Sequence, residues 1–205
     1  MTCRLVRGLI TLALVAAALA PARAQDPRMG TRLDAPSRAA ITALVDSARA
    51  QGIPVEPLME KVHEGMGKGA DGPRIVAAVR SLALEMASAH RALGTVASAD
   101  EIKAAASAMH AGVPAVELGK MKKQSGLRRS LTLPFTVLAD IVSRGVPVET
   151  AANAIRSLMG KGAKDADINT FQRNVRVDIE QGAPPAAAAE TRAKAVPAPK
   201  PDGEI

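Results

Sequence analysis

The residues of this sequence most suited to binding form a cluster of one charge, with five basic residues in ten positions: Lys120, Lys122, Lys123, Arg128 and Arg129. No acidic residue occurs between Glu117 and Asp140. Cations at this density attract anionic lipid headgroups, cell-wall polymers, nucleic acid or an acidic partner, although no interleaved aromatic residue favours nucleic acid. We expect a helical hairpin to bring both halves of the cluster to one face, forming an anionic-surface site. The alternative interpretation is a solvated corner between two helices.

Two segments resemble phosphate-binding loops, Gly67-Lys68-Gly69 and Gly160-Lys161-Gly162. A phosphate loop needs a glycine five residues before its Gly-Lys pair, where this sequence has Val62 and Ile155. A serine or threonine must also follow the lysine, and here a glycine does. We therefore interpret both segments as helix C-termini, with lysine favoured by the helix dipole and glycine as the cap.

The three histidines do not complete a catalytic or metal-binding motif. His63-Glu64 begins like a zinc-protease motif, but Gly67 occupies the place of the second histidine. His90 and His110 have no histidine or carboxylate three or four residues further on. The methionines form no closely spaced pairs, which favours a role as core filler over copper binding. We assign no catalytic residue, cofactor or metal ligand, and an enzyme site assembled from distant residues is the least favoured alternative.

The first 24 residues have the pattern of a secretory signal peptide. Arg4 and Arg7 precede an uncharged apolar run, and the segment closes on Ala22-Arg23-Ala24. The run from Leu9 to Ala20 is shorter than the roughly 20 residues that a membrane-spanning helix needs. We expect export to the periplasm or cell exterior, cleavage before Gln25, and no transmembrane segment in the mature chain.

Composition narrows the class of the mature chain. The only cysteine of the full sequence, Cys3, lies in the signal segment. The mature protein would therefore form no disulfide and no thiolate metal site. Phe135 and Phe171 are the only aromatic residues, which argues against a β-sandwich and against stacking on nucleic-acid bases. Without the signal there are 24 basic and 20 acidic residues, a modest positive charge that does not by itself indicate nucleic-acid binding.

A recurring Gly-(Ile/Val)-Pro tripeptide predicts tight corners between antiparallel helices. Glycine ends one helix in the left-handed conformation, and proline suits the first turn of the next. The tripeptides supply the structural turn residues Gly52 and Pro54, Gly112 and Pro114, and Gly145 and Pro147. Apolar residues recur at helical spacing on both sides of these corners.

The sequence also indicates an internal duplication. At an offset of 93 residues, 11 of the 31 positions from Gly52 to Leu82 are identical. The predicted copies are about 44–82 and 137–175. We therefore expect an all-α fold of successive helical hairpins, arranged as a bundle or a short superhelical stack. The predicted helices are 37–51, 54–67, 72–93, 99–111, 114–124, 132–144, 147–160 and 165–180.

The predicted organisation is a signal peptide (1–24), a flexible leader (25–36), an all-α domain (37–181) and a disordered tail (182–205). The tail is rich in proline and alanine and has almost no bulky apolar side chain. The function we expect is that of a non-enzymatic binding or scaffold protein of the cell envelope, whose partner is a protein or an anionic envelope component. The alternative is a chaperone-like or lipid-interacting protein.

Overall fold

The computed structural model describes residues 33–125 and 129–196, which form α-helices joined by short turns, with no strand among them. The predicted signal peptide lies outside the described residues. The helices are α1 (Ala35–Ala50), α2 (Glu56–Gly67), α3 (Gly72–Leu93), α4 (Ala99–His110), α5 (Ala115–Ser125), α6 (Thr132–Ser143), α7 (Val148–Gly160), α8 (Asp165–Glu180) and α9 (Pro185–Ala195).

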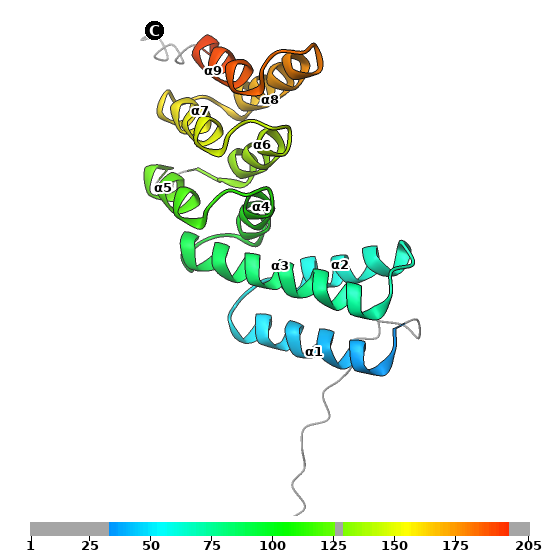
Figure 1. Ribbon diagram of the computed structural model, residues 1–205. Helices are drawn as coiled ribbons and strands as arrows, with labels where there is room; N and C mark the ends of the chain where they lie inside the picture. The colour runs from blue at the N-terminus through cyan, green and yellow to red at the C-terminus, as the bar shows by residue number, and fades with distance from the viewer. Residues whose placement is uncertain (1–32, 126–128, 197–205) are drawn as a thin grey trace, which may run out of the picture.

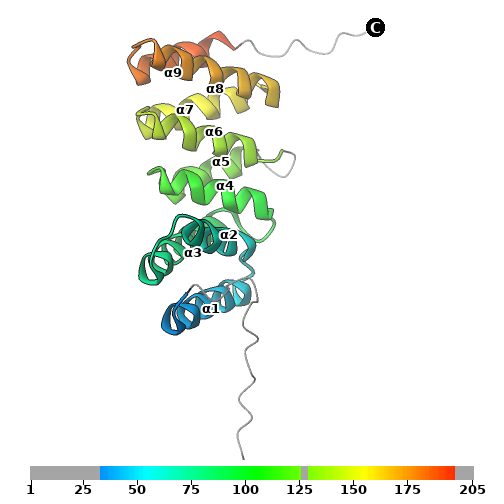
Figure 2. The same ribbon diagram turned by 90° about the vertical axis from the view of Figure 1, so that its right-hand side faces the viewer.

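The helices form a stack of hairpins, which confirms the expected fold class (Figures 1 and 2). In the C-terminal part, α4, α6 and α8 pack on one another in one row, and α5, α7 and α9 form the second. At the N-terminal end the long helix α3 packs against α1, α2, α4 and α5. The main helix–helix contacts are therefore between neighbouring hairpins of the stack.

The predicted corners are confirmed. Gly52, Gly112 and Gly145 have φ angles of +69°, +104° and +91°, the left-handed region that glycine adopts without strain. The residue after each glycine returns its N–H to the preceding helix, as Ile53 does to the carbonyl of Ala48 at 2.9 Å. Because the same residue is buried, each corner both caps one helix and anchors it in the core.

The two glycine–lysine segments are also helix C-termini, as expected. The helices α2 and α7 end at Gly67 and Gly160, and Gly69 and Gly162 have φ angles of +69° and +77°. Each segment precedes the next helix by only a few residues and forms the turn between the two helices.

A regular 33-residue spacing, which sequence analysis did not detect, underlies the C-terminal part of the stack. The helices α4, α6 and α8 begin at residues 99, 132 and 165. Ile102, Phe135 and Ile168 occupy equivalent places in them and are all buried. The spacing is hard to detect because the equivalent core residues change in size, as Ala105, Leu138 and Phe171 illustrate.

Both predicted flexible ends need correction. The leader prediction is wrong at its end, because α1 begins at Ala35 and Leu33 is buried. The tail prediction is wrong for the described residues of 182–196, because Pro185–Ala195 is a helix packed on α7 and α8. Alanine has the highest helix propensity and its small side chain allows close packing, so a segment without bulky residues still docks. The rest of the tail, 197–205, lies outside the described residues.

Candidate functional site

A hollow lies between α2 and α4, over α3. It consists of two adjoining cavities of about 250 and 400 Å³, which share Lys61, Leu82 and Ser107. We refer to these two cavities together as the α2–α4 groove.

Each boundary of the groove is one stripe of a helix, because residues three and four apart lie on the same helical face. The floor is a stripe of α3 with an apolar centre, and the walls are more polar stripes of α2 and α4. The lining residues are Pro57, Glu60, Lys61 and Glu64 from α2, Ala78, Ser81, Leu82 and Glu85 from α3, and Lys103, Ser107 and His110 from α4.

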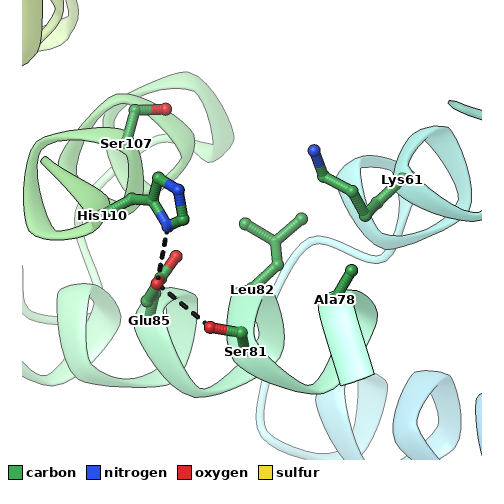
Figure 3. A pocket seen from close by; sticks show the side chains of 7 residues that line it. All are labelled: Lys61, Ala78, Ser81, Leu82, Glu85, Ser107 and His110. Atoms are coloured by element: carbon green, nitrogen blue, oxygen red, sulfur yellow. Dashed lines mark hydrogen bonds and ion pairs between the residues drawn. The ribbon is translucent and has the colours of Figure 1, made fainter. Parts of the chain in front are cut away.

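A histidine and a carboxylate meet at one end of the groove (Figure 3). One oxygen of Glu85 accepts hydrogen bonds from Nδ1 of His110 at 3.1 Å and from the hydroxyl of Ser81 at 3.3 Å. Because the carboxylate of Glu85 can only accept, Nδ1 of His110 carries a proton in this contact. The side chain of His110 is 77% exposed and that of Glu85 is 20% exposed, so the histidine faces solvent at the open end of the groove.

Sequence reasoning missed this pair, since 25 residues separate the two partners. Their positions on α3 and α4 become neighbours only when the two helices pack. The serine–histidine–carboxylate arrangement of a hydrolase is not assembled, because the carboxylate of Glu85 holds Ser81 and the hydroxyl of Ser107 donates to the carbonyl of Lys103 at 3.1 Å.

Ion pairs line the other end of the groove. Lys103 on α4 contacts Glu60 on α2 at 2.5 Å and so joins the two walls. Glu64 contacts both Lys61, at 2.6 Å, and Lys68, at 2.5 Å. The hydrogen bonds from Lys61 and Lys68 lower the pKa of Glu64 to about 2, so its carboxylate is charged throughout the physiological pH range. The groove therefore presents both signs of charge beside an apolar floor.

The predicted basic cluster is divided among contacts within the fold. Lys120 contacts Glu117 at 2.6 Å, and Lys122, which is 14% exposed, contacts Glu101 at 3.3 Å.

Arg129, in the second half of the cluster, is also held by contacts within the fold. Arg129 donates to the carbonyl of Ala163 at 2.6 Å and to the carboxylate of Asp165 at 3.0 Å. Lys123 is exposed, and Arg128 lies outside the described residues. Three of the four described members thus contact acids, Lys120 on its own helix and Lys122 and Arg129 on other helices. The acid-free stretch of sequence does not produce an acid-free surface.

Glu101 is a buried polar residue that sequence analysis did not single out. Its side chain accepts hydrogen bonds from the backbone N–H of Leu131 at 2.8 Å and of Ser98 at 3.1 Å, and it pairs with Lys122. Burial alone would raise the pKa of Glu101. The two N–H groups and the ammonium of Lys122 outweigh burial and hold the pKa below its ordinary value. The spacing Ser98-x-x-Glu101 is the sequence signature of a capping box and could have identified this residue.

The described residues contain neither a cluster of metal-binding side chains nor a helix suited to crossing a membrane. Within 33–125 and 129–196, no group of three or more histidine, cysteine, aspartate or glutamate side chains is placed to hold a metal ion. No helix in the same part of the chain combines the length and apolar character needed to cross a membrane.

No protein-family model matches this chain, and neither a curated protein nor a solved structure matches it.

Proposed function

We propose that this chain is an exported, non-enzymatic binding or scaffold protein of the cell envelope, and that its α2–α4 groove contacts a protein partner. The observation that carries this proposal is the groove itself, which is open, apolar at its centre and charged at both walls. The proposal of export depends on the pattern of residues 1–24.

The arrangement of the helices supports a binding role. In stacked-hairpin proteins each unit contacts only its neighbours, and the stack presents extended surfaces on which partners bind. A floor containing Ala78 and Leu82, bordered by lysines and glutamates, matches the mixed chemistry of a peptide or protein surface. A simple anion would instead call for a concentration of cations.

An anionic-surface role is the second candidate. Exposed Lys123 supports it, whereas the pairing of Lys120, Lys122 and Arg129 with acids of the fold weighs against it. Co-sedimentation with anionic and neutral vesicles at low and high salt measures this role separately. Binding that is specific for anionic vesicles and is lost at high salt would favour it.

The binding role of the groove is tested by placing a large side chain in it. Ala78 lines the groove and is exposed on α3, so an Ala78→Arg side chain would enter the cavity without disturbing the core. Its neighbour Ala77 is also exposed but does not line the groove, which makes Ala77→Arg the matched control. We expect cross-linked partners captured from envelope extracts to be lost with Ala78→Arg and kept with Ala77→Arg. Equal capture by both variants would remove the groove from the proposal.

Export is tested separately by mass spectrometry of the protein from cell-envelope and culture fractions. We expect a mature chain that begins at Gln25. A cytoplasmic protein that retains residues 1–24 would contradict the export proposal and leave the groove proposal standing.

A further inference from the structure

The last helix, α9, is attached to the stack differently from the other helices of its row. It packs against α7 and α8 at the end of the stack opposite to α1 (Figure 1). Its buried residues are Ala188, Ala189 and Ala193 only. The helix before it in the row, α7, buries Ile155 and Leu158 in addition to its alanines. Apolar burial therefore contributes less to the docking of α9 than to that of α7.

Cavities lie on both flanks of α9. One of about 290 Å³ separates α9 from α7, with Thr150, Asn153 and Ser157 on the α7 side. Another of about 160 Å³ lies between α8 and α9, beside Phe171 and Asn174. The short side chains of α9 leave space on the faces of α7 and α8 that longer side chains would occupy.

Polar contacts hold α9 in place. Arg192 forms two hydrogen bonds with the carboxylate of Asp178 on α8, both at 2.6 Å. The ammonium of Lys161, after α7, donates to the carbonyls of Ala193 and Val196 at 3.0 and 3.1 Å. Two charged side chains from the body of the stack thus hold the C-terminal part of α9. Contacts of this kind weaken as salt concentration rises.

We propose that α9 is a displaceable helix. In the free chain it occupies a docking groove on α7 and α8, and it undocks as a unit to admit a helix of a partner protein. The contacts of α9 define that partner helix: small residues against α7, a cation opposite Asp178, and backbone carbonyls within reach of Lys161. Longer side chains on its flanks would fill the two cavities. Segments that form few apolar contacts open before the rest of a protein does, so displacement does not require the stack to unfold.

Hydrogen exchange of the full chain tests the undocking step. We expect the amides of α9 to exchange together and at least tenfold faster than those of α7 and α8. Asp178→Asn should accelerate exchange in α9 alone. The matched control is Glu60→Gln, which removes an ion pair between α2 and α4 and should leave α9 unchanged. Equal protection of α7 and α9, or an effect of Asp178→Asn on every helix, would overturn the proposal.

A peptide of residues 183–196 tests whether the vacated groove accepts a helix. In the full-length Arg192→Glu chain, Asp178 repels the chain's own α9, so a fluorescent wild-type peptide should bind. The wild-type chain, whose groove is filled, should bind it at least tenfold more weakly. A peptide carrying Arg192→Glu should bind neither chain. If the Arg192→Glu chain shows fast exchange in α9 but does not bind the wild-type peptide, the groove is not a docking site and the proposal is wrong.

Discussion

The two predicted copies, which lie in α1–α3 and α6–α8, begin alike and end differently. At the offset of 93 residues their corner glycines coincide, and the third helices begin at Gly72 and Asp165. The third helix of the first copy, α3, continues for 22 residues to Leu93, whereas its counterpart α8 has 16 and stops at Glu180. The longer helix α3 packs against both α4 and α5, while the shorter α8 turns at Gly182 into α9. The two copies thus differ in the length of their third helix and in its packing, since α3 contacts two following helices and α8 contacts α9.

The largest effects are expected in the shared core. Ile75 and Ile168 are identical residues at equivalent positions, and both are buried. Changing either to alanine should cost about 2–5 kcal/mol, since a buried isoleucine leaves a cavity that relaxes only in part. Urea denaturation measures both values. Equal costs would mean that the copies pack alike, and a clearly smaller cost at Ile168 would mean that the end of the stack adapts more easily. Val177→Ala, at an exposed position of α8, is the control for a surface change.

The junction between the copies should be nearly as sensitive. Glu101→Ala removes the acceptor for the N–H groups of Ser98 and Leu131 and leaves Lys122 without its partner. We expect a loss of about 2–4 kcal/mol from these unsatisfied buried groups. The measurement is the free energy of unfolding of the variant at neutral pH. A loss below 1 kcal/mol would show that water replaces the missing carboxylate.

The charge of Glu101 predicts a pH dependence at the same junction. Because the folded-state pKa of Glu101 is lowered, its contribution is present above the ordinary glutamate range. That contribution is lost as the pH falls through the lowered pKa. Glu101→Gln should therefore lower stability at pH 7 and change it little at pH values below the lowered pKa. Parallel stability curves for the two proteins across this range would contradict the assignment.

Smaller effects are expected at the equivalent corners. Gly52→Val and Gly145→Val each place a branched side chain at a positive φ angle and should cost about 1–3 kcal/mol. A Cβ at Gly52 meets no atom within 4 Å, and one at Gly145 lies 3.7 Å from Pro185, so backbone strain is the dominant cause at both. Thermal unfolding of the two variants compares the corners directly. A much larger loss of stability for Gly145→Val than for Gly52→Val would show that the new side chain also disturbs the contact with α9.

The smallest stability effect should come from removing the end of the chain. Deleting residues 183–205 takes away α9, which buries only three alanines, so the thermal midpoint should fall by about 2–8 °C. Composition alone predicted almost no change. A midpoint that does not move would restore the view of this segment as a tail, and a fall far beyond this range would show that α9 is integral to the stack.

Local patterns were enough to predict much of the fold. The corners could be predicted because glycine and proline determine backbone conformation by themselves, and eight helices followed with ends within about two residues of those described. The helix α9 was missed because its stability depends on contacts with Asp178 and Lys161, which lie outside it. Such long-range contacts leave no periodic signal in the helix itself.

The candidate site was less predictable for the same reason. The acids that pair with Lys122 and Arg129 lie 21 and 36 residues away, beyond the stretch in which the basic cluster was recognised. The pair of His110 and Glu85 also forms only through packing, between α3 and α4. Charge counted along a sequence therefore described the surface poorly.

The 33-residue spacing of α4, α6 and α8 has an evolutionary consequence. An in-frame gain of 33 codons would insert one complete hairpin into the two rows, and an equal loss would remove one. Because hairpins contact chiefly their neighbours, such a change would leave α1 and α9 in their own surroundings. The distance between the two ends of the molecule is therefore a heritable trait that changes in whole steps, independently of the surfaces that the ends present.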